Sequence, residues 1–126
     1  MKLSTLMVNS TIVAGPFGIG LVVLPEALFS LYGVTTNLPL NYVGQLFGGC
    51  LIMIALLAWG ARNATNSVAL RAIVLSFFVG DTIGFCVALF AQLGGVVNAL
   101  GWSTVLIYFL LALGYGYFHF SKTEPR

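Results

Sequence analysis

The chain has 126 residues, of which 60% are hydrophobic and only 6% carry a charge, and its formal net charge is +2. Soluble globular domains have about a quarter of their residues charged, so this composition excludes a soluble fold. Four membrane-spanning helices of roughly 20 residues each account for nearly the whole length, which leaves no room for a nucleotide-binding or nucleic-acid-binding domain. We therefore predict an all-α integral membrane protein in which residues 1–126 form a single transmembrane domain.

The first predicted span covers about residues 5–24 and contains Pro16 with glycines on both sides. This composition favours a kinked and closely packed helix, and no A-x-A cleavage site follows the apolar run, so we expect the span to be retained. Pro25 then ends or bends the helix. The amphipathic segment 26–32 is too short to span, and we expect it to lie along the membrane interface and to end at Gly33.

The other three predicted spans are runs of about twenty apolar residues bounded by polar or aromatic ones. They cover about residues 41–60, 69–92 and 102–120. Small residues four apart on a helix let two helices approach closely in lipid, either within one chain or in a dimer. The glycines for which we predict this role are Gly44, Gly48, Gly80 and Gly84.

All five basic residues fall on one side of this four-span arrangement. They are Lys2, Arg62, Arg71, Lys122 and Arg126. The opposite side keeps only Glu26. Because cytoplasmic loops of membrane proteins carry the excess of lysine and arginine, both termini are predicted to be cytoplasmic. Topology accounts for every basic residue, so there is no basic surface that would favour a nucleic-acid partner.

Asp81 is a carboxylate near the middle of the third predicted span, about 15 Å along the helix from Arg71. A charge at that depth costs about 2.5 to 3.5 kcal/mol, so the side chain should face the protein interior. One interpretation makes Asp81 a proton or cation site. The other makes it a packing residue that is hydrogen-bonded to Tyr108 or Thr104. The sequence leaves both open.

Counted along the helices, several polar side chains lie level with Asp81 or toward the outer face, where they can line a cavity. The ligand- or ion-binding candidates are Asp81, Tyr108, Gln45, Asn41, Gln92 and Glu26. Aromatic residues lie on the same faces of the third and fourth spans, and they either line a lipid, quinone or sterol pocket or pack the core. These aromatic residues are Phe77, Phe78, Phe85, Tyr108 and Tyr115.

The sequence contains no motif for catalysis, metal binding or cofactor binding. Cys50 and Cys86 lack the paired spacing of a zinc or redox site and are expected to pack as small hydrophobic residues. His119 has no second histidine within a span to complete an axial haem pair, so we expect it at the membrane interface. Nucleophile elbows, phosphate loops and paired intramembrane carboxylates are absent too. We predict no cofactor and no metal, and an enzyme is the weakest function class.

A faint sequence repeat relates the two halves at an offset of 61 residues. Matched positions include Phe17 with Phe78, Phe29 with Phe90, and Asn37 with Asn98. Such matches arise easily among the few residue types of apolar helices. If the repeat is real, it predicts two helical hairpins related by an axis along the membrane normal.

Two stretches resemble a known group of proteins. They are Gly44-Gln45-Leu46-Phe47-Gly48-Gly49, followed by an apolar run to Trp59-Gly60-Ala61-Arg62, and Pro25 with Leu31-Tyr32-Gly33. Here the chain resembles the small bacterial four-helix membrane proteins grouped as DoxX-like. The resemblance implies a bacterial inner-membrane protein, and some members of the group accompany quinone-linked oxidoreductases.

Three functions are compatible with these observations. The leading hypothesis is a non-enzymatic membrane protein that binds a small apolar ligand or a partner membrane protein. The first alternative is a small homo-oligomeric transporter or channel, most simply a dimer, that uses Asp81 as a proton or cation site. The second alternative, which follows from the resemblance, is an accessory subunit of a quinone-linked membrane oxidoreductase.

Overall fold

The computed structural model describes residues 2–121, and over this range the chain forms five α-helices and no strand. The helices are α1 (Leu3–Val23), α2 (Pro25–Leu31), α3 (Leu38–Ala61), α4 (Val68–Leu93) and α5 (Gly101–Phe120). All except α2 are long enough and apolar enough to cross a membrane. The predicted all-α fold with four helices of spanning length is confirmed, and the bounds of each predicted span lie within three residues of those of the observed helix.

Local sequence signals determine where the helices begin. The side chain of Asn37 accepts a hydrogen bond from the backbone N–H of Leu40 at 2.9 Å and caps α3. Ser67 caps α4 in the same way through the N–H of Leu70 at 3.2 Å. Pro25 is the first residue of α2, a position where its missing N–H loses no helical hydrogen bond.

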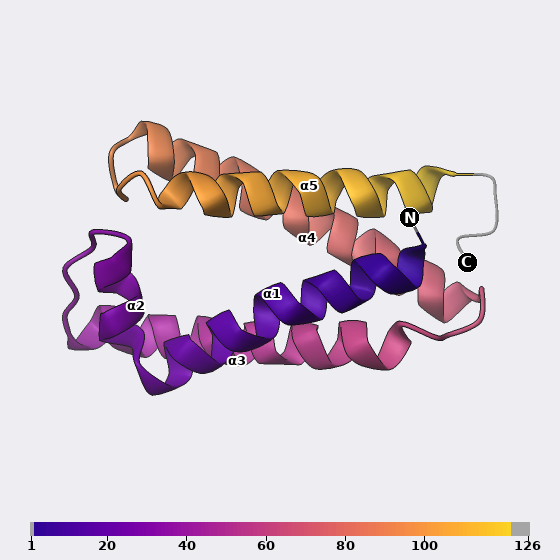
Figure 1. Cartoon of the computed structure of the whole chain (residues 1–126), viewed down its shortest axis with the longest axis horizontal. Helices are drawn as coiled ribbons and strands as arrows, with labels where there is room; N and C mark the ends of the chain where they lie inside the picture. The colour runs from indigo at the N-terminus through magenta and orange to yellow at the C-terminus, as the bar shows by residue number, and fades with distance from the viewer. Residues whose placement is uncertain (1, 122–126) are drawn as a thin grey trace.

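The short helix predicted after the first span is present as α2, one residue earlier than expected. It turns away from the end of α1 at the left of Figure 1. Its C-terminus is closed by Gly33, whose φ of 75° is accessible to glycine at little cost. The N–H of Gly33 donates to the carbonyl of Ser30 and that of Val34 to the carbonyl of Phe29, both at 3.0 Å. These paired bonds form a Schellman motif and fix the direction of the following loop.

The four long helices form two antiparallel hairpins, α1 with α3 and α4 with α5, which lie as lower and upper pairs in Figure 1. Within the first hairpin the two backbones touch. A Cβ placed on Gly48 would lie 2.7 Å from the carbonyl oxygen of Gly18, and a Cβ on Gly18 would lie 2.8 Å from that of Gly48. Only glycine at both positions allows this approach.

The other three glycines predicted to support helix contacts differ in their surroundings. A Cβ on Gly44 would overlap the ring of Phe29 in α2, at 2.6 Å from Cε2. Gly84 lies directly beneath the ring of Tyr108 in α5. A Cβ on Gly80, by contrast, would meet nothing within 4 Å, because this residue is on the exposed side of α4. Gly80 therefore has no helix-packing role within the chain.

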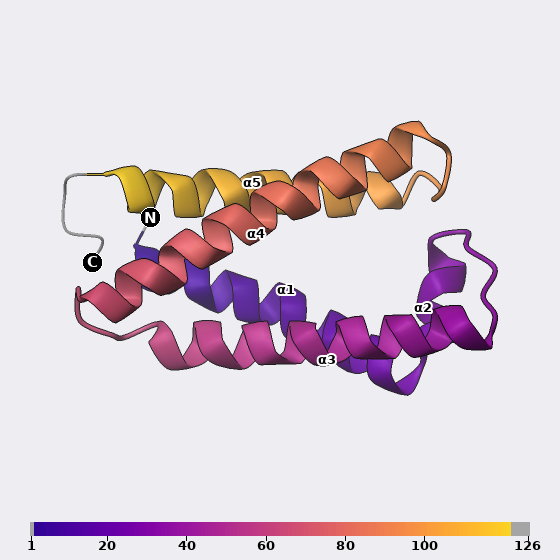
Figure 2. The same ribbon diagram turned by 180° about the vertical axis from the view of Figure 1, so that it is seen from behind.

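The two hairpins share a hydrophobic core only toward the end of the molecule where α1 begins. Its buried residues come from all four long helices: Leu3, Leu6, Met7, Ala58, Ala61, Leu70, Val74, Phe77, Tyr115 and Phe118. α4 contributes no buried residue after Phe77. Figure 2 shows the reason, since α4 runs diagonally and leaves α3 as it rises toward the loop before α5.

The two halves of the chain have the same topology. The offset of 61 residues aligns α4 with α1 and α2 together, and α5 with α3. Gly95, with φ of 74°, ends α4 as Gly33 ends α2: its N–H donates to Gln92 at 3.2 Å, and the N–H of Val96 donates to Ala91 at 3.0 Å. The two hairpins start at the same end of the molecule (Figure 1), and the repeat itself stays a prediction.

Candidate functional site

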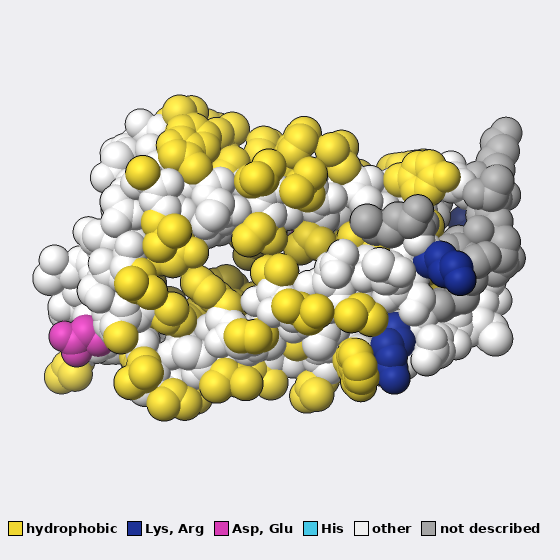
Figure 3. Space-filling view, viewed as in Figure 1, with side chains coloured by type: hydrophobic (Ala, Val, Ile, Leu, Met, Phe, Trp, Pro, Cys, Tyr) yellow, Lys and Arg dark blue, Asp and Glu magenta, His cyan; other side chains and the backbone are white. Residues whose placement is uncertain are grey.

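An opening separates α1 from α5 beyond the shared core, and a hydrogen bond between side chains bounds each of its ends. At the core end, Ser10 Oγ and the Tyr115 hydroxyl are 2.7 Å apart, and both residues are buried. At the α2 end, Thr104 Oγ1 donates to the Tyr32 hydroxyl at 3.1 Å. We call the space between these two bonds the α1–α5 window. Figure 3 shows the surface hollowed between the upper and lower helix pairs.

Tyr108 lies at the middle of the window. It is one turn of α5 beyond Thr104 and two turns before Tyr115, and those two bounding residues are about 16 Å apart along the helix. The ring of Tyr108 rests on the backbone of Gly84, where any side chain would collide with it. Glycine at this position of α4 therefore holds the tyrosine ring in place.

Asp81 lies at the midpoint of α4 and belongs to the same site. One turn earlier, Phe77 is in the shared core, where its ring packs edge-on against that of Tyr115 with the centroids 5.1 Å apart. Gly84, on which the Tyr108 ring rests, is three residues further along α4, so Asp81 lies on the same helix face as that contact. The Asp81 side chain is only partly buried.

The packing interpretation of Asp81 required a hydrogen bond to Tyr108 or Thr104, and the described residues contain neither bond. The Thr104 hydroxyl donates to Tyr32 instead. Over residues 2–121, Asp81 has no hydrogen-bond partner. Within residues 2–121 that form of the packing interpretation is wrong, since neither Tyr108 nor Thr104 is bonded to Asp81 and the Thr104 hydroxyl is bonded to Tyr32.

Three of the predicted polar candidates lie on the first hairpin near α2, away from Asp81. Gln45 donates from Nε2 to the carbonyl of Val22 at 3.0 Å, which ties α3 to the end of α1. Asn41 has a buried Oδ1 without a partner among residues 2–121. Glu26 is in the first turn of α2 and is exposed. None of the three is hydrogen-bonded to Asp81 or Tyr108.

The remaining candidate, Gln92, belongs to the loop contact that joins the two hairpins at the α2 end. Its Nε2 donates to the carbonyl of Asn98 at 3.1 Å. Asn98 in turn donates from Nδ2 to the carbonyl of Leu31 at 3.0 Å, and its backbone N–H donates to the carbonyl of Tyr32 at 2.9 Å. Gln92 therefore supports the outer edge of the window and does not line its centre.

Sequence reasoning missed Ser10 and Tyr32, the two residues of the first hairpin that bond across the window. Ser10 is one turn from Leu6 and one from Ala14, so it lies on a buried face, where a serine hydroxyl needs a partner. This buried position could have been used to predict a hydrogen-bond partner for Ser10 on another helix. Tyr32 follows α2 directly, and only the loop geometry brings its hydroxyl to Thr104.

The cysteines and the aromatic residues also have defined surroundings. Cys50 and Cys86 are free and exposed on the outward faces of α3 and α4. The aromatic residues make ring contacts instead of leaving an empty pocket. Centroid distances are 5.5 Å for Phe78 with Phe120 and 5.4 Å for Phe85 with Phe109. Within residues 2–121 no three His, Cys, Asp or Glu side chains cluster.

Comparison with known proteins adds no relative: no family model, no curated protein and no solved structure matches this chain.

Proposed function

We propose that this chain is an integral membrane protein that binds a small, mainly apolar ligand in the α1–α5 window, with Asp81 as the polar anchor. One observation carries the proposal: a carboxyl at the midpoint of a membrane-length helix is only partly buried and has no hydrogen-bond partner among residues 2–121. Polar groups at membrane depth are costly, and proteins retain them chiefly where function uses them.

The walls of the window support an apolar ligand. Phe17 of α1 packs edge-on against Tyr32 with ring centroids 6.1 Å apart, and Tyr108 lies on the same helix face of α5 as Thr104 and Tyr115, which bond across to the first hairpin. Aromatic walls with few polar groups are typical of small-molecule sites. Because the opening lies on the side of the bundle, a ligand dissolved in the bilayer can enter without crossing water. The ligand that fits best has an apolar body and one amine or hydroxyl group.

Photolabelling tests where such a ligand binds. The probes are decylamine and decanol, each with a diazirine in the alkyl chain, added to the protein in lipid nanodiscs. We expect crosslinks at Phe17 and Tyr108. We expect few at Ile83 and Val87 on the outer face of α4, which are 58% and 63% exposed. Equal labelling of both faces would show that the probes report only the surrounding lipid.

A pair of adjacent substitutions provides the matched control. Val13 follows Ser10 by three residues and precedes Phe17 by four, so it lies on the window side of α1. Val13→Trp should fill the window and reduce labelling of Tyr108 at least fivefold. Ile12→Trp places the same ring on the exposed lipid side and should leave labelling unchanged.

We also infer that the end of the molecule where α1 begins is cytoplasmic. Lys2, Arg62 and Arg71 lie where α1 begins, α3 ends and α4 begins, and Figure 3 shows basic side chains gathered at one end with an acidic one at the other. Lys122 and Arg126, which sequence reasoning placed on the same side, lie outside the described residues. The excess of basic residues supports this orientation.

Cysteine accessibility tests the orientation. In a background without Cys50 and Cys86, Val96→Cys should react with a membrane-impermeant maleimide added outside intact cells. Asn63→Cys, in the turn between α3 and α4, should react only after the membrane is permeabilised. The reverse pattern would invert the topology, and with it the proposed bacterial inner-membrane orientation.

A second candidate function rests on the same carboxyl. An intramembrane acid that is open to a ligand space can also carry a proton or a small cation, so transport by a dimer of this chain, with Asp81 as the coupling site, is the alternative. Uptake of decylamine into proteoliposomes, driven by a pH gradient, separates transport from binding alone.

A further inference from the structure

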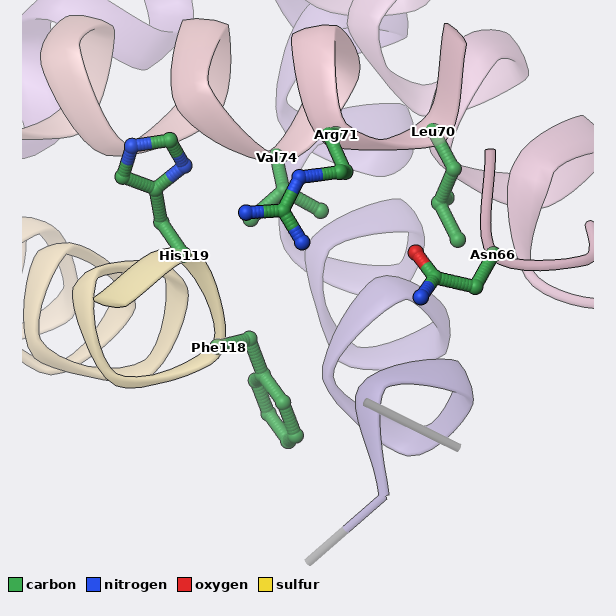
Figure 4. Close-up of a pocket in the computed structure, with 6 residues that line it drawn as sticks. All are labelled: Asn66, Leu70, Arg71, Val74, Phe118 and His119. Atoms are coloured by element: carbon green, nitrogen blue, oxygen red, sulfur yellow. The ribbon is translucent and has the colours of Figure 1, made fainter. Parts of the chain in front are cut away.

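A shallow pocket lies at the opposite end of the molecule from α2, where α4 begins and α5 ends. Its lining residues are Asn66, Leu70, Arg71, Val74, Phe118 and His119. Figure 4 shows the guanidinium of Arg71 between the imidazole of His119 and the amide of Asn66. Leu70, Val74 and Phe118 belong to the shared core and form the apolar floor.

Among the described residues, the pocket is lined by a positively charged side chain, Arg71, and by no carboxylate. The carboxylates of residues 2–121 are Glu26 and Asp81. Glu26 is in α2 at the far end, and Asp81 is about 15 Å from Arg71 along α4. The positive end of the α4 helix dipole adds to the charge of Arg71. The imidazole of His119 has a buried Nδ1 without a partner among these residues, so a polar group entering here gains a further contact.

We propose that this pocket binds the phosphate of an anionic phospholipid. An arginine fork beside an imidazole is a donor set that suits phosphate oxygens. The enclosed volume is about 10 Å³, room for one oxygen and not for a whole ligand. That size fits a headgroup that lies over the pocket at the membrane surface, with its acyl chains along α4 and α5. Basic pockets between spanning helices recognise anionic headgroups in this way. The inference does not depend on the proposed ligand of the window.

Native mass spectrometry of the detergent-solubilised full chain tests the proposal. Dioleoylphosphatidylglycerol should remain bound at collision energies that remove dioleoylphosphatidylcholine. Arg71→Gln should weaken retention of phosphatidylglycerol roughly tenfold, the loss expected for one charge-assisted phosphate contact. Arg71→Lys keeps the positive charge but lacks the forked guanidinium. Its retention of phosphatidylglycerol should lie between that of the unchanged protein and that of Arg71→Gln.

Arg62→Gln is the matched control, since it removes the same charge at the same end of the molecule. Arg62 lies over the ring of Trp59, 3.6 Å from its centroid, and does not line the pocket. It should change retention less than twofold. Equal losses in the two arginine variants would show general surface attraction and would overturn the site.

Two further measurements keep the result interpretable. His119→Gln should also weaken phosphatidylglycerol retention, about threefold, while its circular dichroism and gel-filtration profile match those of the unchanged protein. Inorganic phosphate at 10 mM, a concentration chosen as roughly saturating for weak anion sites, should not displace the lipid. Displacement would identify free phosphate as the ligand and reject the phospholipid.

Discussion

Replacing Gly48 with valine should disrupt the α1–α3 hairpin and lower the free energy of unfolding by about 3 kcal/mol, at the upper end of typical overpacking penalties. The new Cβ would lie 2.7 Å from the Gly18 carbonyl oxygen, 2.9 Å from Leu21 Cβ and 3.0 Å from Val22 Cγ2. The nearest of these atoms is backbone, so rotating a side chain cannot relieve the collision. Reversible unfolding in mixed detergent micelles measures the change.

Gly49→Val is the control for this experiment. A Cβ on Gly49 meets nothing within 4 Å, so the neighbouring substitution adds the same side chain on the exposed side of α3. Its free energy of unfolding should stay within about 0.5 kcal/mol of the unchanged protein. If both valines destabilise equally, the effect belongs to helix propensity, and the backbone contact has no special role.

Replacing Asp81 with leucine should have opposite effects on stability and on binding. The carboxyl lies at mid-helix without a hydrogen-bond partner among residues 2–121, so removing it should raise the free energy of unfolding by about 1 to 3 kcal/mol. The affinity for decylamine should fall about thirtyfold, because the leucine variant offers no charge to the amine. Equilibrium dialysis in nanodiscs measures the affinity.

Asp81→Asn separates charge from hydrogen bonding. It should leave stability within about 1 kcal/mol and bind decanol as before, while losing the preference for decylamine. Thr82→Val is the matched control: its hydroxyl bonds back to the carbonyl of Phe78 at 2.7 Å on the exposed side of α4, and its loss should not change binding. Unchanged decylamine affinity in Asp81→Asn would remove Asp81 from the site. Uptake that persists in that variant would reject it as a coupling residue.

Apolar run lengths were sufficient to predict the helices, because membrane thickness dictates about twenty residues per span. Pro25 marked the break after the first span, and Gly33 marked the end of α2. Asn37, which caps α3, was not recognised as a helix start, so the predicted span began three residues too late. The divergence of the hairpins could not be predicted. Helix faces that contact lipid and faces that contact protein are both apolar. Hydropathy therefore does not show that Phe77 is the last residue of α4 to be buried against the rest of the protein.

The site was predicted in part. Asp81 stood out because it is the only carboxylate in its span, and helix counting placed Tyr108 near it. Counting along a helix gives depth but not rotation between helices. It therefore grouped Gln45 and Asn41 with a carboxyl they do not contact, and it missed the bond from Ser10 to Tyr115, which depends on how two distant helices cross.

Because each hairpin packs mostly within itself, the first half of the chain can complete its helix contacts while the second half is still being synthesised. The hydrogen-bond partner of Ser10, Tyr115, is synthesised 105 residues later in the chain. Before Tyr115 enters the bilayer, the Ser10 hydroxyl can donate a hydrogen bond to a carbonyl of its own helix. Entry of α5 into the bilayer is thus the event that covers the face of α1 bearing Leu3 and Leu6. A nascent protein stalled before α5 would expose that face to membrane chaperones and proteases.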